Sequence, residues 1–346
     1  MSGPFRFTDR AAREAAETEL APAAARSATS RGRARPEPAD PLRTEFERDR
    51  DRILHAKAFR RLKHKTQVFL NPDGDHFVTR LTHTLQVTQV ARSLARALGL
   101  NETLAEAIAL AHDVGHSPFG HLGEDALEPY VAGGWHHAAQ GVRIVEVLEH
   151  LNLTEEVRDG VRSHSWKIDP PPSTREGECV RYADRIGYLS HDALDAIRAG
   201  VLRLGDLPAR PLEVFGEPGS EMVGRMIDAV VEGSLSAANT AGVVVMAPEK
   251  LEAMHELRAF MFERVYNSQT AAGQKHVAID VIRRLVDHHL AHPELIPQSY
   301  RDPDADVLTQ VVDYVSGMTD RFALAMHDRL FDADAAARMV PLLRTT

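Results

Sequence analysis

The sequence predicts an all-α protein. Apolar residues recur at helical spacing along most of the 346-residue chain, and Pro and Gly residues separate these periodic stretches. Only VVVMA at residues 243–247 is typical of a β-strand. We find no internal repeat of the kind that a solenoid would show. The length fits one large domain or two ordinary ones.

The composition is typical of a soluble globular protein and argues against several other classes. The apolar content is 43% and the charged content 26%, with no apolar run of membrane-spanning length and no signal-peptide pattern at the N-terminus. The single cysteine, Cys179, excludes an internal disulfide and a multi-cysteine zinc site. The net charge of −9 argues against a general nucleic-acid binder, although it permits a local basic pocket. We therefore expect a cytoplasmic protein with no membrane partner.

The chain begins with a segment that contains little to bury. Residues 1–45 are rich in Ala, Arg, Glu and Pro, so we expect a flexible arm that is disordered or lies on a partner subunit. A helix is expected over 46–66, and the NPDG sequence at 71–74 predicts a turn. The next helix, over 82–99, places His83 on its apolar stripe and ends at Gly99.

Further helices follow to the C-terminus. One begins with a capping box, Thr103 to Glu106, and must end by about residue 117 because Pro118 cannot continue it. The later helical patterns cover 136–150, 154–164, 178–199, 221–239, 249–267, 276–290, 305–330 and 333–344, whereas 170–173 and 205–220 are expected to be loops. We divide the chain into the arm, a core over 46–200 and a helical C-terminal part over 201–346.

Histidines and carboxylates gather in ALAHDVGHSPFGHLGED at residues 109–125. His112 and Asp113 flank one wedge of space at the end of a helix, because consecutive residues are turned by about 100°. His83 lies near the start of the preceding helix. Two helices with a short connection pack antiparallel, so the two histidines should meet.

A further carboxylate is expected from the stretch CVRYADRIGYLSHDALDAIRAG at 179–200, where Asp184, Asp192 and Asp195 are the candidates. Two histidines and two carboxylates suit Mn, Fe, Co, Ni or Zn, and Mg less naturally. Each feature alone has a plainer interpretation: a histidine of the core, a chance His-Asp pair, or a solvated acidic face. Their combination is much rarer, and it predicts a metal site that activates water.

Long collinear strings in the chain resemble a known family. They are RRLKHKTQVF (60–69), TRLTHTLQVTQVAR (79–92), AIALAHDVGHSPFGHLGE (107–124), HHAAQ (136–140) and YADRIGYLSHD (182–192). These strings resemble the bacterial deoxyguanosinetriphosphate triphosphohydrolase-like proteins of the HD superfamily of metal phosphohydrolases, over roughly residues 40–290. The resemblance implies an HD-domain helical bundle with additional C-terminal helices, which complete the nucleotide pocket and form an oligomer interface.

The resemblance also implies roles for particular residues. The metal ligands become His83, His112, Asp113 and Asp184. His116 and His121 match catalytic histidines, with Glu124 as their carboxylate partner. The substrate contacts implied are Gln67 for the base or sugar, Arg80 for the α-phosphate, His137 (with His136 as a confusable neighbour) and Asp192 for the triphosphate, Tyr188 and Tyr266 for the sugar, and Arg258 for phosphate. The family often reads ADDIAY where this chain reads ADRIGY, and we expect the extra cation, Arg185, to help neutralise the triphosphate.

The function implied is hydrolysis of dGTP, and of other dNTPs, to deoxynucleoside and inorganic triphosphate. Water activated by one divalent ion would attack the α-phosphorus, and His121 would protonate the leaving 5′ oxygen. Further partners implied are a second Mg with the triphosphate, a dNTP activator and a homo-oligomer such as a hexamer. The sequence leaves open the base preference, the physiological metal, an allosteric site and the oligomer number.

Two alternatives remain at this stage. One is another HD-superfamily hydrolase, such as a phosphodiesterase, a 5′-nucleotidase or a (p)ppGpp hydrolase. The other is a regulator that senses dNTPs or binds single-stranded nucleic acid. Its support is the RRLKHK run at 60–65 and the basic arm with Arg31, Arg33 and Arg35.

Overall fold

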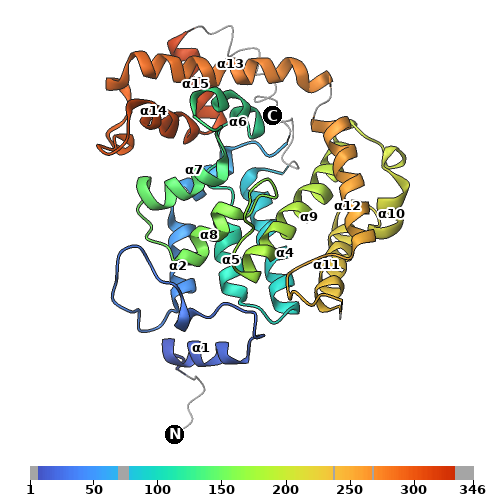
Figure 1. The fold of residues 1–346 in the computed structure, drawn as a ribbon. Coiled ribbons are helices and arrows are strands. Elements are labelled where there is room, and N and C mark those ends of the chain that lie inside the picture. Colours follow the sequence, from blue (N-terminus) through green and yellow to red (C-terminus); the bar gives the residue numbers. More distant parts are fainter. Residues whose placement is uncertain (1–6, 69–77, 237, 267–268, 332–346) are drawn as a thin grey trace.

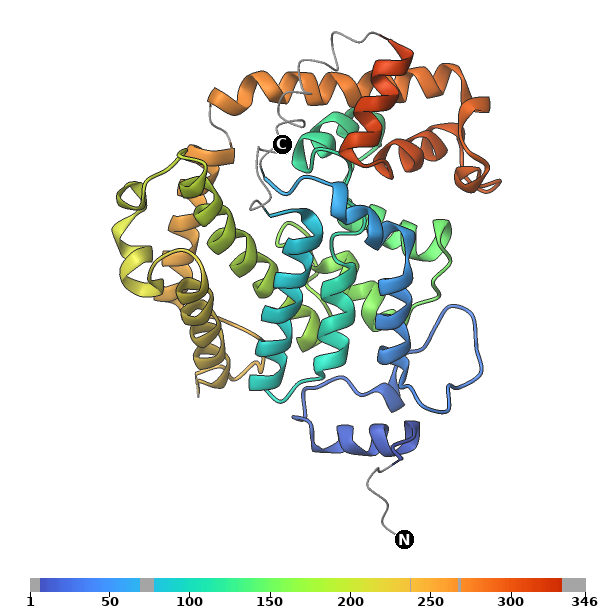
Figure 2. The same cartoon turned by 180° about the vertical axis from the view of Figure 1, so that it is seen from behind.

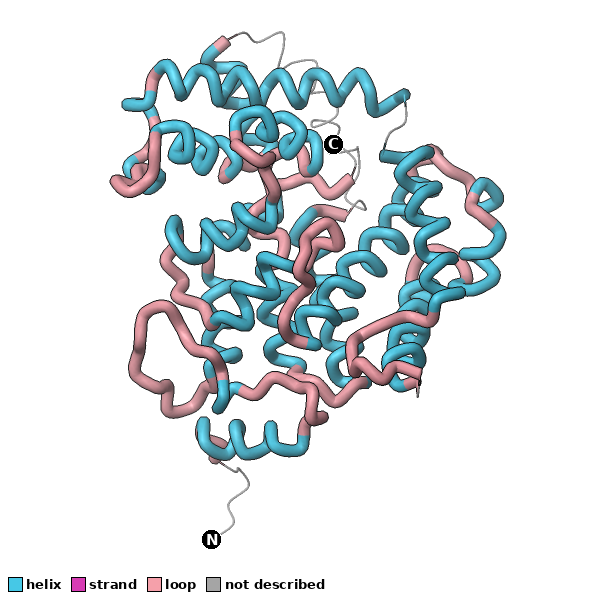
Figure 3. Tube along the Cα trace, in the orientation of Figure 1, coloured by secondary structure: helices cyan, strands magenta, loops and turns pink. Residues whose placement is uncertain are grey.

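The computed structural model describes residues 7–68, 78–236, 238–266 and 269–331, and within them the chain is all-α, as the sequence predicts (Figures 1 and 3). The described residues contain two isolated β-bridges but no strand. The helices are α1 Arg10–Ala16, α2 Glu45–His55, α3 Lys57–Arg61, α4 Arg80–Ala97, α5 Glu102–Ala111, α6 His121–Leu127, α7 His137–Arg143, α8 Glu155–Ser163, α9 Arg175–Arg198, α10 Ala209–Phe215, α11 Ser220–Leu235, α12 Pro248–Met261, α13 Gln269–Ala291, α14 Val307–Ser316 and α15 Asp320–Leu330.

A central bundle of α2, α4, α5, α8 and α9 surrounds the main hydrophobic core (Figure 1). The apolar stripe predicted for α4 is buried here, because Val87, Val90 and Leu94 are fully inaccessible to solvent. Helix α4 packs against both α5 and α9. This arrangement brings the start of α4, the end of α5 and the middle of α9 to one place.

Helices α11 and α12 pack on one side of this bundle against α9, and α10 packs on α11 and α12 (Figure 2). The strand expected at 243–247 is wrong, because its amides do not pair with a neighbouring strand. The backbone N–H groups of Val244 and Met246 donate instead to Glu178 and to the Tyr182 hydroxyl, at 2.8 and 3.2 Å. The loop expected at 205–220 contains the helix α10.

A second hydrophobic core lies between α6, α13, α14 and α15, in the upper part of Figure 1. The single helix expected over 305–330 is divided into α14 and α15, because Thr319 caps a new helix by accepting the N–H of Phe322. The helix expected over 333–344 lies outside the described residues.

Two other helix boundaries differ from expectation because side chains cap the helices. The helix expected over 46–66 breaks at Ala56, where the Glu149 carboxylate accepts the N–H groups of Lys57 and Ala58, both at 2.7 Å. Helix α5 is capped by the Asn101 side chain rather than by Thr103. Glu149 is distant in sequence from the helix that it caps, and Asn101 lies two residues before the predicted cap, Thr103.

The flexible arm expected over 1–45 differs most from the structure. Residues 9–35 pack on the chain's own helices, with Arg33 only 5% exposed and paired with Asp49 and Glu45. Ala25 donates its N–H to Glu176 on α9 at 3.0 Å. Low hydrophobicity misled the prediction, because ion pairs and hydrogen bonds hold this segment in addition to the few apolar side chains, Leu20, Ala24 and Ala25, that pack on the main core.

No helix in the described ranges is both long and apolar enough to cross a membrane.

Candidate metal centre and catalytic loop

Three helices bring His83, His112 and Asp184 together. His83 stands at the start of α4, His112 caps the end of α5, and Asp184 lies in the middle of α9. Asp184 Oδ1 is 3.2 Å from His83 Nε2 and 3.9 Å from His112 Nε2. One ligand atom from each residue lies within 4.8 Å of the others, so the three can share one metal ion.

The His112 ring is oriented for metal binding by its own helix. Its Nδ1 donates to the Ala109 carbonyl at 2.6 Å, which leaves the Nε2 lone pair free. That Nε2 atom is buried and has no hydrogen-bond partner in the described part of the chain. A buried polar atom without a partner is costly, so the arrangement fits a divalent ion bound there.

Asp113 joins this cluster to the following loop. Its Oδ1 is 3.4 Å from His112 Nε2, and its Oδ2 accepts a hydrogen bond from Arg80 at 2.7 Å. Although burial would raise the pKa of Asp113, the nearby His112, Arg80 and His116 side chains hold it well below its usual range. The carboxylate is therefore ionised and available to bind the same ion as the two histidines.

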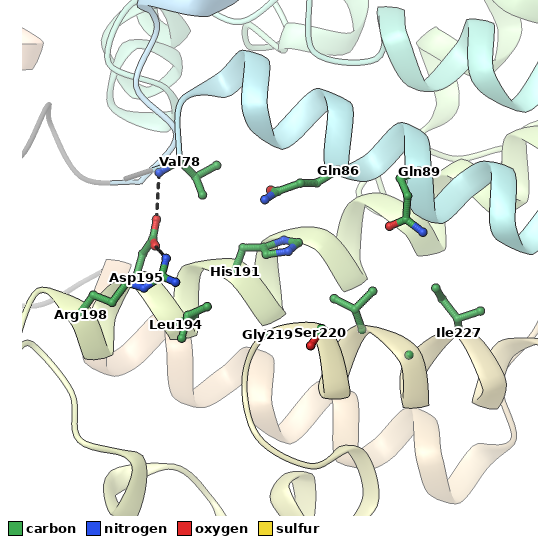
Figure 4. Close-up of a pocket in the computed structure, with 12 residues that line it drawn as sticks. Val78, Gln86, Gln89, His191, Leu194, Asp195, Arg198, Gly219, Ser220 and Ile227 are labelled. Carbon is green, nitrogen blue, oxygen red and sulfur yellow. Dashed lines mark hydrogen bonds and ion pairs between the residues drawn. The ribbon is translucent and has the colours of Figure 1, made fainter. Parts of the chain in front are cut away.

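The three aspartates considered for the fourth ligand separate in space. Asp192 accepts a hydrogen bond from the Tyr266 hydroxyl at 2.6 Å. Asp195 accepts the N–H of Val78 at 3.0 Å and lines a cavity of about 490 Å³ between α4, α9 and α11 (Figure 4). Of the three, only Asp184 lies beside both His83 and His112.

The loop after α5 folds back sharply toward the cluster. At Gly115 an added Cβ would lie 2.1 Å from the His137 carbonyl oxygen and 2.3 Å from the Gly141 nitrogen, so a side chain cannot fit. Phe119 and Gly120 both have positive φ, 62° and 59°. The prediction that the helix ends before Pro118 agrees with this path.

A second group of histidines lies on the folded-back segment and on α7. The Glu124 carboxylate accepts hydrogen bonds from His121 Nδ1 at 2.7 Å and from His137 Nδ1 at 2.6 Å. The rings of His116 and His137 are stacked, with centroids 3.8 Å apart. His116 is buried and its Nε2 lies 3.2 Å from Asp113 Oδ1, whereas the His121 side chain is 66% exposed.

Charge and burial set the ionisation of this second group. Burial would raise the pKa of Glu124, but the neighbouring His137 and His121 side chains hold it far below its usual range. Burial is also the main reason that the pKa of His116 lies well below its usual value. Glu124 is therefore an ionised acceptor that fixes the orientation of two imidazoles.

Sequence reasoning missed His164, at the end of α8. It is 1% exposed, its Nε2 lies 3.0 Å from His137 Nε2, and its ring centroid is 5.2 Å from that of His112. Burial lowers its pKa to about 3. A histidine in the last turn of a helix, as at His112, was the signal that could have found it.

His136 and His137 are distinguished by the structure. The His136 side chain caps α7 by accepting the Ala138 N–H at 3.1 Å. The His137 side chain instead donates a hydrogen bond to the Glu124 carboxylate at 2.6 Å. Burial lowers the pKa of His136 to about 4.

The predicted substrate contacts fall into two sets. The first set lies around α9 and α12 and consists of Arg185, Tyr188, Asp192, Arg258 and Tyr266. Burial raises the pKa of Tyr188, and the nearby Arg185 and Arg258 oppose this rise. Arg185 itself lies over the Trp166 ring, 3.8 Å from the centroid, and contacts His255 Nε2 at 3.2 Å. Arg80 and Gln67 form the second set. Arg80 is 2% exposed and donates to Asp113, and the buried Oε1 of Gln67 has no hydrogen-bond partner among the described residues.

The fold and this site define the chain as an HD-domain phosphohydrolase. The HD domain family model matches residues 80–189, and the phosphohydrolase-associated domain matches 244–329. A crystal structure of a phosphohydrolase from Bacteroides thetaiotaomicron has the same fold, with a TM-score of 0.52 and 17% identity over 84% of this chain and 72% of that chain.

More particularly, the chain belongs to the family of deoxyguanosinetriphosphate triphosphohydrolase-like proteins. It is 46% identical to such a protein from Caldanaerobacter subterraneus subsp. tengcongensis, over 90% of this chain and 92% of the relative. It is 43% identical to one from Desulfatibacillum aliphaticivorans, over 90% of this chain and 94% of the relative.

Proposed function

We propose that the protein hydrolyses deoxynucleoside triphosphates to deoxynucleoside and inorganic triphosphate. The observation that carries this proposal is the buried Nε2 of His112, which has no hydrogen-bond partner among the described residues and lies beside Asp113 and Asp184. His121, paired with Glu124, follows at the end of the next loop. The names of the relatives direct the proposal to dGTP and related nucleotides. The base preference is decided by the shape of the pocket and is left to experiment.

His83, His112, Asp113 and Asp184 would hold one divalent ion. When bound, this ion supplies Lewis-acid stabilisation of phosphate charge and lowers the pKa of a water ligand. Arg80 keeps Asp113 ionised and in place through its 2.7 Å hydrogen bond. His83 and His112 are each 1% exposed, so water is excluded from their side of the cluster.

His121 is the proton donor in this proposal. Its Nδ1 donates to the Glu124 carboxylate, so a protonated ring presents Nε2–H on its exposed side. The departing 5′ oxygen requires a proton, and an imidazolium supplies it near neutral pH. His116 is buried against Asp113 and would orient that carboxylate. His116 and His137 would both contact the triphosphate.

Cations and tyrosines of α4, α9 and α12 would bind the rest of the substrate. Arg80, Arg185 and Arg258 would balance the triphosphate charge. Tyr188, with Tyr266 fixed by its hydrogen bond to Asp192, would leave no room for a 2′-hydroxyl and so select deoxyribose. Gln67 would contact the base or the sugar.

The test is product chromatography after incubation of the purified protein with each dNTP and with GTP, in Mn or in Mg. Deoxynucleoside and intact triphosphate are expected, and a His112→Ala/Asp113→Ala variant should form neither. The matched control is His292→Ala, which removes a half-exposed histidine at the end of α13. Light scattering on the same sample tests the proposed homo-oligomer.

Other results have definite meanings. Turnover of a dNTP mixture but of no single dNTP would support an activating nucleotide. Release of pyrophosphate or monophosphate would indicate another HD hydrolase. Binding of single-stranded DNA without turnover under any mixture or metal would favour the regulator.

A further inference from the structure

We propose that Asp320, the first residue of α15 and next to the turn from α14, is a positioning residue for the catalytic loop at 113–121. This proposal rests on the proposed function, because it assigns the loop its catalytic histidines. The turn belongs to the region matched by the phosphohydrolase-associated domain, and it therefore gives that region a direct role at the site of the HD domain.

Asp320 holds two distant backbone segments at once. Its Oδ1 accepts the N–H of Phe119 at 3.0 Å, and its Oδ2 accepts the N–H of Thr66 at 2.9 Å. The side chain is 4% exposed, so both hydrogen bonds are shielded from water. A carboxylate can accept two such bonds, which neither an amide nor a hydroxyl of similar size can do in the same way.

Lys65 completes the attachment of the same loop. Its ammonium donates to the carbonyl of His116 and, at 3.1 Å, to the carbonyl of Ser316 at the end of α14. Lys65 is 3% exposed, and its charge is partly balanced by Asp320. The loop is thus attached at His116 and at Phe119 to a turn that lies about 200 residues later in the chain.

The loop needs this support because its backbone is in an unfavourable conformation. Phe119 has φ 62°, a region that a bulky L-residue rarely adopts because its side chain crowds the backbone there. The Phe119 side chain is buried in the second core, among residues of α13, α14 and α15. Such a conformation persists only where surrounding contacts fix it, and the Asp320 carboxylate fixes the Phe119 amide itself.

Loss of this support would move the catalytic groups rather than remove them. His116 and His121 lie three and two residues from Phe119 along the chain. A displacement of about 1 Å in a catalytic group costs roughly 10²-fold in rate. We therefore expect turnover to fall while the metal ligands, held by α4, α5 and α9, remain in place.

The experiment compares Asp320→Asn with Asp49→Asn. Asp320→Asn keeps the size of the side chain but replaces one carboxylate oxygen with an NH₂ group. The side chain can then accept only one of the two N–H groups, that of Phe119 or that of Thr66. Asp49, on α2, is a matched control because it is also buried and also accepts a backbone N–H, from Thr154 at 2.8 Å, away from the loop. Each full-length variant is measured for Tm, kcat, KM and hydrogen exchange of the peptide 114–120.

Both variants should lose thermal stability. Only Asp320→Asn should lower kcat, by at least tenfold with KM changed less than threefold, and only it should speed exchange in 114–120. A kcat within threefold of the parent, or an equal loss in Asp49→Asn, would overturn the proposal. If the parent itself turns over no dNTP, the proposed function fails, and unchanged exchange at 114–120 in Asp320→Asn then separately refutes the positioning role.

Discussion

Gly115→Ala is expected to damage the site through space alone. The new Cβ would lie 2.1 Å from the His137 carbonyl oxygen, and ordinary contact begins at 3.4 Å, so the start of α7 must move by roughly 1 Å. Overpacking of this kind costs about 1–3 kcal/mol, and a 1 Å shift of His137 should lower kcat about 10²-fold. Chemical denaturation and steady-state dNTP hydrolysis measure the two effects.

Gly224→Ala is the control for this experiment. Gly224 lies inside α11 with nothing within 4 Å of an added Cβ, so alanine should stabilise the protein by about 0.5–1 kcal/mol and leave kcat unchanged. A Gly115→Ala protein with parental stability and activity would show that α7 does not depend on this close approach and would refute the reasoning.

Two further predictions concern buried groups. Burial raises the pKa of Glu176 to about 7, so its contribution to stability is present below pH 4.5 and is lost as the pH rises to 7. Glu176→Gln should therefore have the same free energy of unfolding as the parent at pH 4 but be more stable at pH 8, by an amount on the order of 3 kcal/mol. Urea unfolding at both pH values measures this. A difference in the free energy of unfolding that is the same at both pH values would contradict it. His164→Ala should weaken Mn binding about 10- to 100-fold, because His164 supports His137 and packs beside His112. Mn titration of metal-free protein, with the exposed His150→Ala as control, tests this, and equal affinities would count against it.

The sequence predicted those parts of the fold that depend on local pattern. The stripe of Val87, Val90 and Leu94 placed His83 on α4, and the antiparallel turn placed His112 beside it, as the structure has them. Helix breaks made by distant partners were missed: nothing near Ala56 indicates that Glu149 caps the next helix. The strand at 243–247 failed because its amides bond to side chains of other elements.

The candidate site shows the same division. Spacing on α9 left Asp184, Asp192 and Asp195 equivalent, since a helical stripe does not say which neighbour each residue faces. The structure separates them, because Tyr266 and Val78 are contributed by other segments. Asp320 could not be predicted for the same reason, because its partner Phe119 lies 201 residues away.

The N-terminal segment at 9–35 has a consequence for the order in which the chain folds. Ala25 bonds to Glu176, 151 residues later, and Arg31 bonds to Glu156, 125 residues later. This segment therefore finds its partners only after α8 and α9 have been synthesised. Helices α4 and α5 are close in sequence and can pair earlier. Docking of the N-terminal segment closes a much longer loop of chain and therefore costs more conformational entropy. Until those helices have been made, the segment stays exposed to proteases and chaperones.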